Sequence, residues 1–388
     1  GYAALDANTT GASNIAVGKN ALGANTTASY NTAVGADALT ANTTGTKNTG
    51  IGYEALEGTT TGSYNTSVGS NSLKSNTTGV SNNALGQAAL GSNTTGSNNV
   101  AIGLDALATQ QTANDNTAVG YFALKANTTG TKNVGVGASA LDANTTGSYN
   151  TALGHSALYK NTTAARNTAI GNDALTENTT GASNVAVGDR ALDANTTGNQ
   201  NTAVGSQSLS ANTTGGYNVA IGDASMIVAT TGSYNVAVGY RTLNTQTTAE
   251  YNVAIGGNAL RLNETGTRNV AIGYNCMDAN LASDNTAVGF EALRYTTTGT
   301  QNCAVGQDCM QDNTTGSYNT AMGYEALTNS TTSSNNSAFG NQALEANTTG
   351  ASNTAVGKDS LMFITTGQEC TAVGHNALRN NTASEITA

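Results

Sequence analysis

Side chains able to do acid–base or metal chemistry are few in this sequence, and their spacing does not bring them together. His155 and His375 are the only histidines, and thirteen units of the repeat described below separate them, so they cannot share a site. The acidic residues never follow the Gly-Gly-x-Gly-x-Asp spacing of calcium-binding β-rolls. No glycine-rich stretch is followed by the Lys-Ser/Thr pair of a phosphate-binding loop. The sequence therefore predicts no enzymatic activity, no catalytic residues, no metal site and no cofactor, and it predicts two solvated loop histidines.

The four cysteines do not form a disulfide framework. Cys276 and Cys309 hold equivalent places two repeats apart, which in a stacked structure separates them by roughly 9–10 Å, too far for a bridge. Cys303 and Cys309 flank one glycine and could face each other across a coil. The favoured alternative is that the cysteines fill small spaces in the core.

Tyrosine is the residue type whose placement most suggests binding. Thirteen of the 15 tyrosines fall at two places in the repeat. Tyr217, Tyr234 and Tyr251 follow one another at single-repeat spacing, so they could stack as an exposed ladder that grips sugars or proteins. The alternative is that tyrosines cover strand ends and the edge of a neighbouring chain.

Paired threonines raise two further hypotheses. Rows of threonine at β-strand spacing are the kind of surface that binds ice, but the pair lies beside Asn and Gly and is interrupted in several repeats. Asn-Thr-Thr is also an acceptor sequence for N-glycosylation, as at Asn8, Asn42 and Asn144. Turn formation explains the cluster better than either function.

These side chains are positioned by a strict repeat. A glycine returns every 17 residues from Gly1 to Gly273 and again from Gly289 onward, with a single step of 16 between the two series. Such a period indicates one short unit stacked about 23 times. We therefore expect a single β-solenoid domain over residues 1–388, cut from a longer array, with a length of roughly 110 Å at about 4.8 Å per rung.

The repeat is numbered here from its glycine at position 0. Positions −4 to −1 are rich in Thr and Val and alternate, which predicts a short strand. The glycine is expected to end this strand with a positive φ. A second short extended segment is expected to carry the Leu at +4 inward, and Asn-Thr-Thr-Gly at +7 to +10 to turn the chain toward the next rung. Helix is a poor alternative for so short a unit.

Two positions carry the packing predictions. Asn at −4 occurs in 21 of 22 repeats and is expected to form a ladder of amides along the stack. Position −2 is always Ala, Gly or Ser, although it lies between two positions expected to face inward. We interpret this size limit as an outward face packed against identical chains, with Ala186, Ala203 and Ala220 as candidate interface residues. The alternative places these alanines inside a narrow coil of a monomeric chain.

Composition limits the partners. The net charge is −10, only 10% of residues are charged, and no basic run is present, so nucleic-acid binding is not expected. No long apolar run is visible, and we expect no membrane insertion by this section. Proline and tryptophan are absent.

The motifs resemble a known family. Residues 98–103, 251–256 and 268–273 read Asn-Asn-Val-Ala-Ile-Gly, Tyr-Asn-Val-Ala-Ile-Gly and Arg-Asn-Val-Ala-Ile-Gly. They are similar to the Asn-Ser-Val-Ala-Ile-Gly motif of YadA-like heads in trimeric autotransporter adhesins, and similar repeats occur in phage tail fibres. The resemblance implies a left-handed parallel β-roll, a homotrimer, extracellular display at a cell surface or on a virion, and attachment to a host-surface protein or glycan. The repeat is longer than the typical head repeat, and no stalk or anchor pattern is present.

The sequence therefore predicts an all-β parallel solenoid that serves as a structural and adhesive fibre segment and mediates surface attachment. The alternative is a self-assembling extracellular filament without a specific receptor. Ice binding and an enzyme of the parallel β-helix type are more distant alternatives, because the latter would need a carboxylate cluster on one face.

Overall fold

The computed structural model describes residues 1–388 and consists of short parallel strands joined by turns. It contains no helix, and so no helix with the length and apolarity needed to span a membrane. The chain divides into two compact units, Gly1–Thr197 and Gly198–Ala388, which are built from the same repeat and contain eleven strands each. Each unit is a parallel β-solenoid with about 17 residues per turn, as the sequence predicts. The expectation of one domain over residues 1–388 stays a prediction.

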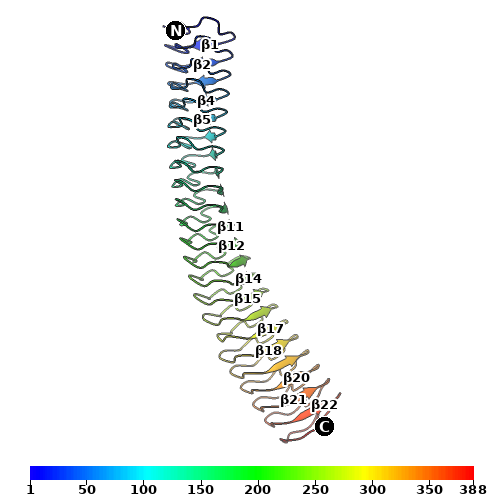
Figure 1. Ribbon diagram of the computed structural model, residues 1–388. Coiled ribbons are helices and arrows are strands. Elements are labelled where there is room, and N and C mark those ends of the chain that lie inside the picture. The colour runs from blue at the N-terminus through cyan, green and yellow to red at the C-terminus, as the bar shows by residue number, and fades with distance from the viewer. The chain divides into compact units, whose positions relative to one another are not determined.

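The strands of the first unit stack in sequence order, from blue to green in Figure 1. They are β1 (Ile15–Val17), β2 (Thr32–Val34), β3 (Thr49–Ile51), β4 (Thr66–Val68), β5 (Asn83–Leu85), β6 (Val100–Ile102), β7 (Thr117–Val119), β8 (Val134–Val136), β9 (Thr151–Leu153), β10 (Thr168–Ile170) and β11 (Val185–Val187). Each strand from β1 to β10 pairs in parallel with the next at a shift of one repeat, for example Thr117 with Val134.

The second unit repeats this arrangement. Its strands are β12 (Thr202–Val204), β13 (Val219–Ile221), β14 (Val236–Val238), β15 (Val253–Ile255), β16 (Val270–Ile272), β17 (Thr286–Val288), β18 (Cys303–Val305), β19 (Thr320–Met322), β20 (Ser337–Phe339), β21 (Thr354–Val356) and β22 (Thr371–Val373). The single 16-residue step lies between β16 and β17, which still pair in register, Val270 with Thr286. The missing residue therefore falls in the turn, where the strand ladder is unaffected.

The repeat glycine ends each strand in a conformation that other residues rarely adopt. Gly120 has φ +140°, which confirms the positive φ expected from the sequence. A Cβ at this position would collide with the carbonyl oxygen of Gly137 in the next rung. The glycine is therefore required both by its backbone angle and by the close approach of the neighbouring rung.

The prediction that position −2 faces outward is wrong. Ala186, Ala203 and Ala220 are each 0% exposed within the single chain, so they line the inside of the coil and are not available to a partner. The residues at −1 and −3 face outward instead. A shift of one residue in a strand moves every side chain to the opposite face.

The size limit at −2 follows from the narrow interior. Gly50 occupies this position in one rung, and a Cβ built on it would lie 3.5 Å from Leu39 Cδ1 and 3.2 Å from the carbonyl oxygen of Ala55. The leucine at +4 and the backbone thus leave room for Ala, Gly or Ser only. The packing of a single chain explains the limit without a partner.

The second extended segment is also absent, and each turn of the coil contains only one strand. Positions +2 and +4 adopt left-handed backbone conformations, with φ +59° at Asp37 and +52° at Leu39. Left-handed φ is unfavourable for a residue with a side chain. Hydrogen bonds between rungs hold it here: Leu39 N donates to the carbonyl of Ala55 at 3.0 Å, and Asp37 N donates to that of Lys19 at 2.8 Å. The leucine does point inward, as predicted, and is 0% exposed.

The asparagine ladder at −4 is confirmed. Asn48 N donates to Asn31 Oδ1 at 2.9 Å, and Asn31 Nδ2 donates to the carbonyl of Gly45 at 2.9 Å. The ladder therefore binds side-chain amides to the backbone of the next rung, where the sequence predicted amide-to-amide bonds. In some rungs both contacts form, as when Asn65 Nδ2 donates to Asn48 Oδ1 at 3.2 Å.

A second buried ladder runs along position +7. The sequence predicted only a turn for these asparagines. Asn42 Nδ2 donates to Asn25 Oδ1 at 3.0 Å and to the carbonyl of Gly45 at 3.0 Å. The carbonyl of Gly45 therefore accepts from both ladders, because Asn31 also donates to it. The interior of the coil is thus held by two connected polar columns beside the apolar one.

Candidate functional site

The predicted tyrosine ladder is present on the second unit. The rings of Tyr217 and Tyr234 are 4.8 Å apart with 4° between their planes, and those of Tyr234 and Tyr251 are 5.3 Å apart with 7° between their planes. All three side chains are about half exposed. Because the ring faces cover one another, the stack offers mainly ring edges and hydroxyl groups to solvent. A sugar that stacks on an aromatic face would find only the two ends of this column.

Charged residues continue the tyrosine row. Arg268 holds the same −5 position one rung after Tyr251 and donates from Nε and Nη2 to the two carboxyl oxygens of Asp284, at 2.6 and 2.9 Å. The hydrogen bonds from Arg268 hold the pKa of the Asp284 carboxyl below its usual value. The arginine at this end of the column is thus already paired with a carboxylate.

The paired threonines at +8 and +9 form the outer turn. Thr43 Oγ1, at +8, donates to the carbonyl of Thr60 in the next rung at 3.1 Å, and Thr60 Oγ1 does the same to Thr77 at 3.2 Å. The hydroxyl at +8 is therefore used within the chain. This contact supports the interpretation of the Asn-Thr-Thr-Gly cluster as turn chemistry.

The histidines and cysteines lie apart from one another. His155 is 64% exposed and its Nδ1 lies 3.9 Å from Asp173 Oδ1. All four cysteines are free, so the Cys303–Cys309 bridge is not formed. Cys276 and Cys309 are 0% exposed and fill position +3 of the core, in agreement with the favoured prediction.

The buried thiol of Cys309 forms the same type of hydrogen bond as a serine at the equivalent position. Cys309 Sγ donates to the carbonyl of Ala321 at 3.3 Å, as Ser208 Oγ, at the same +3 position, does to that of Ala220 at 2.9 Å. Burial raises the pKa of both Cys276 and Cys309 to about 12. Protonated thiols of this kind are poor nucleophiles and poor metal ligands.

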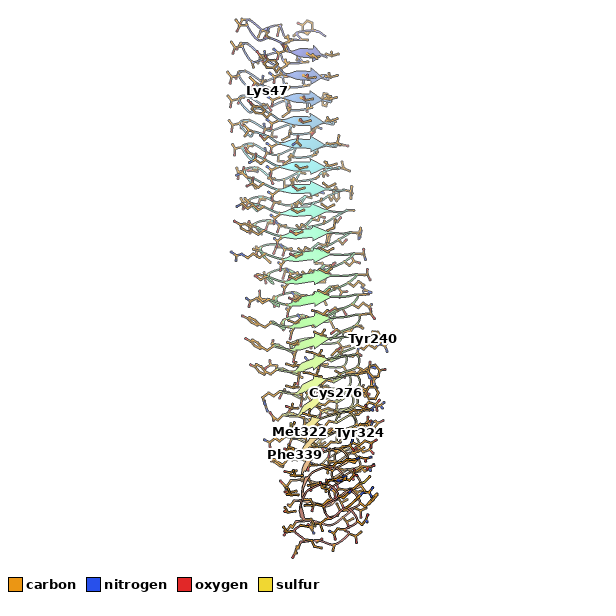
Figure 2. The ribbon with its side chains drawn as sticks, turned by 90° about the vertical axis from the view of Figure 1, so that its right-hand side faces the viewer. Lys47, Tyr240, Cys276, Met322, Tyr324 and Phe339 are labelled. Atoms are coloured by element: carbon orange, nitrogen blue, oxygen red, sulfur yellow. The ribbon has the colours of Figure 1, made fainter.

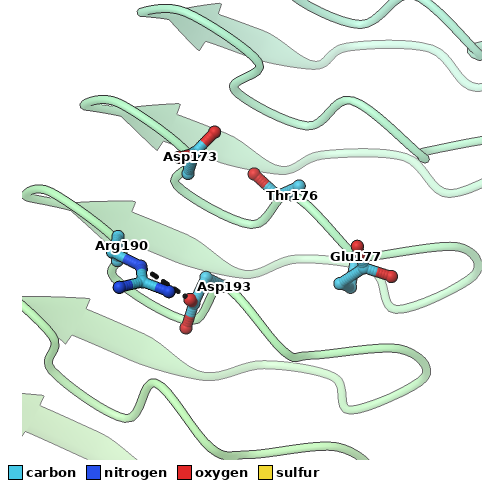
Figure 3. Close-up of a pocket in the computed structure, with 5 residues that line it drawn as sticks. All are labelled: Asp173, Thr176, Glu177, Arg190 and Asp193. Carbon is cyan, nitrogen blue, oxygen red and sulfur yellow. Dashed lines mark ion pairs between the residues drawn. The ribbon is translucent and has the colours of Figure 1, made fainter.

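An acidic hollow of about 260 Å³ lies on the first unit (Figure 3). Asp173, Glu177 and Asp193 line it together with Thr176 and Arg190, and Arg190 Nε lies 3.3 Å from Asp193 Oδ2. Burial raises the pKa of the Asp193 carboxyl, and Arg190 opposes this effect. No group of three or more His, Cys, Asp or Glu side chains is placed to hold a metal ion.

A second hollow, of about 340 Å³, lies on the second unit. The sequence did not predict it. It is lined by arginine, tyrosine and asparagine side chains and by the carboxylate of Asp278, from positions +1, +2 and +5 of consecutive rungs. The available signal was the placement of Tyr240 and Tyr274 at +1 in the rungs on either side of Gly257, with Arg241 next to Tyr240. These residues are scattered in the sequence and come together only when the rungs stack.

The outward face of the strands carries a row of apolar side chains. Position −1 is Val, Ile, Leu, Met or Phe in every strand, and examples in Figure 2 are Met322 and Phe339, which are 44% and 37% exposed. Leu85 and Leu153 in the first unit are 50% and 47% exposed. A contiguous apolar row of this kind is typical of an interaction surface.

Comparison with known proteins adds no identity to this geometry. No protein-family model matches the chain, and no curated protein matches it significantly. The fold, the surfaces described above and the resemblance of the repeat motif therefore carry the functional argument.

Proposed function

We propose that this chain is a segment of a structural fibre that has no enzymatic activity, lies outside the cell and mediates surface attachment. A rigid stack held by backbone and asparagine ladders supports the structural part of the proposal. The resemblance of the repeat to YadA-like heads and to tail-fibre repeats supports display on a bacterial surface or a virion. Repeated weak contacts along such a segment give avidity without a strong single site.

The observation that carries the proposal is the apolar row at −1. Val119 and Val136 occupy it in consecutive rungs, and their side chains leave the coil on the strand face, partly exposed to solvent. Burial of this row against identical chains would remove apolar surface from water in every rung. We therefore propose a homo-oligomer, and specifically the trimer that the resemblance to YadA-like heads implies.

The proposal is tested by molar mass from light scattering. The unaltered chain is expected to have three times the mass of one chain. The variant Val119→Lys/Val136→Lys places two charges on the strand face and is expected to lower the mass to that of one chain. The matched variant Thr128→Lys/Thr145→Lys places the same charges on the outer turn of the same rungs and is expected to leave the mass unchanged.

The same preparations separate assembly from folding. Circular dichroism of all three proteins should show the same β content, because the altered side chains lie outside the coil. A monomeric unaltered chain at about 100 μM, where most specific homo-oligomers are formed, would contradict the proposal. Equal masses for the two lysine variants would also contradict it.

A further inference from the structure

The hollow on the second unit has the composition of a binding site. It is built from four consecutive rungs, whose +1, +2 and +5 side chains meet at the edge that follows the strands; Tyr240 marks this edge in Figure 2. Its volume of about 340 Å³ lies within the range of small-ligand sites. The side chains that line it are polar or aromatic, so it does not resemble an unfilled part of the core.

Two tyrosine side chains line the hollow. Tyr240 and Tyr274 occupy position +1 two rungs apart, about 9.6 Å along the stack, and Gly257 lies between them. One side of Tyr274 packs on Phe290, with ring centroids 5.9 Å apart. A Cβ built on Gly257 would lie 3.2 Å from Tyr274 Cδ2, so the edge of the Tyr274 ring already lies beside this glycine and a side chain there would displace the ring.

The charges in the hollow are unusual for this chain. The second unit has thirteen acidic and only six basic residues, yet three of its arginines line this one hollow. Arg261 is paired with Asp278 through Nε at 2.8 Å. Arg294 is paired with Glu291 through Nη1 at 2.8 Å, and its Nε is buried without a hydrogen-bond partner.

Arg241 supplies the unpaired positive charge. Its side chain is exposed, forms no ion pair with a carboxylate, and lies with its guanidinium carbon 5.1 Å from the centre of the Tyr240 ring. A guanidinium held beside an aromatic ring keeps its donors directed away from that ring, where they can bind an anion in a bidentate manner.

The asparagines supply both hydrogen-bond donors and hydrogen-bond acceptors. Asn258 Nδ2 donates to Asn275 Oδ1 at 3.1 Å, and Asn275 Nδ2 donates to Glu291 Oε1 at 3.2 Å. This chain of bonds fixes both amides, and Asn258, which lines the hollow, keeps its Oδ1 as an acceptor. Fixed amides next to an aromatic ring are suited to the hydroxyl groups of a sugar.

We infer that this hollow on the second unit binds an acidic saccharide, with the sugar ring against the tyrosine side chains that line it and its anionic group on Arg241. The tyrosine side chains offer apolar ring surface to the C–H groups of a pyranose, Asn258 binds a hydroxyl group, and Arg241 binds the carboxylate or sulfate. This inference goes beyond the proposed fibre function and does not depend on it, because one chain supplies all of these residues.

Isothermal titration of the full chain with three tetrasaccharides tests the inference. The hyaluronan tetrasaccharide carries carboxylates alone, the chondroitin 6-sulfate tetrasaccharide carries carboxylates and sulfates, and chitotetraose is neutral. At least one of the two acidic probes is expected to saturate the chain with a 1:1 ratio, and the comparison of the two shows which anion is preferred. Chitotetraose is expected to bind at least about tenfold more weakly, because it cannot use Arg241.

Three variants locate the site. Arg241→Gln and Gly257→Asn are each expected to weaken binding of the acidic probe by about tenfold or more. Arg268→Gln removes one positive charge at the other end of the strands in the same unit and is expected to leave binding unchanged. Gly257→Asn should fold normally, because Asn341 occupies the same +1 position in another rung.

Three results would overturn the inference. The first is no binding of either acidic tetrasaccharide at millimolar concentration. The second is an equal loss of binding in Arg241→Gln and Arg268→Gln, which would indicate a general charge effect. The third is unchanged binding in Gly257→Asn with normal circular dichroism. Light scattering on the same samples reports assembly separately, so failure of this site is distinguishable from failure of the fibre proposal.

Discussion

The side-chain oxygen of Asn133 accepts a hydrogen bond from the backbone N–H of Asn150, 2.9 Å away in the next rung. Asn133 Nδ2 donates in turn to the carbonyl of Gly147 at 2.8 Å. One buried amide thus satisfies two backbone groups that the three-residue strand cannot reach. Side chain–backbone bonds therefore add to the backbone bonds that join successive rungs.

We predict that Asn133→Ala destabilises the first unit by about 3 kcal/mol, because it leaves a buried N–H and a buried carbonyl without partners. Urea denaturation followed by circular dichroism measures the change. Asn172→Ala, at an exposed +1 position, is the matched control and should change stability by less than about 0.5 kcal/mol. Equal effects of the two substitutions would show that the ladder is not a major stabilising element.

A gap in the second ladder predicts a stabilising substitution. Asn42 Oδ1 is buried without a hydrogen-bond partner, and Thr59 occupies position +7 in the next rung, where most rungs carry Asn. Thr59→Asn would supply the missing donor and is expected to stabilise the unit by about 1 kcal/mol. Thr60→Asn, one residue further along in the outer turn, should give no gain. A loss of stability in Thr59→Asn would contradict the ladder geometry.

The inward position of Ala186 predicts how a larger side chain behaves. Ala186→Leu overfills the coil beside the leucine column and should destabilise the chain by about 1–3 kcal/mol. Val187→Leu, on the outward face, should change stability much less. Thermal melts at several protein concentrations distinguish packing from assembly, since a core effect does not depend on concentration. An unchanged melting temperature in Ala186→Leu would indicate that position −2 faces outward.

The buried thiols predict a loss of stability at high pH. The pKa of Cys276 and of Cys309 is raised by burial to about 12, whereas the thiol of an unfolded chain ionises near pH 9. Between these values the unfolded state releases protons that the folded state keeps, so the free energy of unfolding falls as the pH rises from 9 toward 12. Below pH 9 this contribution is constant.

Urea midpoints at pH 8 to 11 measure this effect against the variant Cys276→Ser/Cys309→Ser. Serine occupies the same core position at Ser208 with the same type of hydrogen bond, so the variant should fold. The urea midpoint of the unaltered chain should fall relative to that of the variant as the pH rises above 9. A difference that does not depend on pH would show that these thiols ionise normally in the folded chain.

The strand positions could be read from the sequence because single residues define them. The structure places four features where the repeat predicts them. They are the repeat glycine, the inward leucine at +4, the asparagine at −4 and the stack of Tyr217, Tyr234 and Tyr251. The period alone determines that equivalent residues lie one above another. Deletion of one residue before Asn285 also fell in the turn, as expected.

The orientation of the strand could not be read in the same way. Large apolar residues at −1 suggested an inward face, but a coil filled by one leucine per rung has room only for the alanine at −2. The left-handed conformations at +2 and +4 also gave no signal, because residues as different as Asp37 and Leu39 adopt them. The hollow on the second unit is formed by side chains from four rungs, and no local sequence motif predicts that they come together.

The most direct test of the fibre proposal is oxidative cross-linking from the strand face. In a background with Cys303→Ser, a single cysteine is placed at −1 by Val119→Cys or in the outer turn of the same rung by Thr128→Cys. Around a shared axis, equivalent −1 residues of different chains approach closely, whereas the outer turns point away. The proposal predicts rapid formation of covalent dimers by Val119→Cys and none by Thr128→Cys under the same oxidant. Equal cross-linking of the two variants, or its absence at Val119→Cys, would contradict assembly through the strand face.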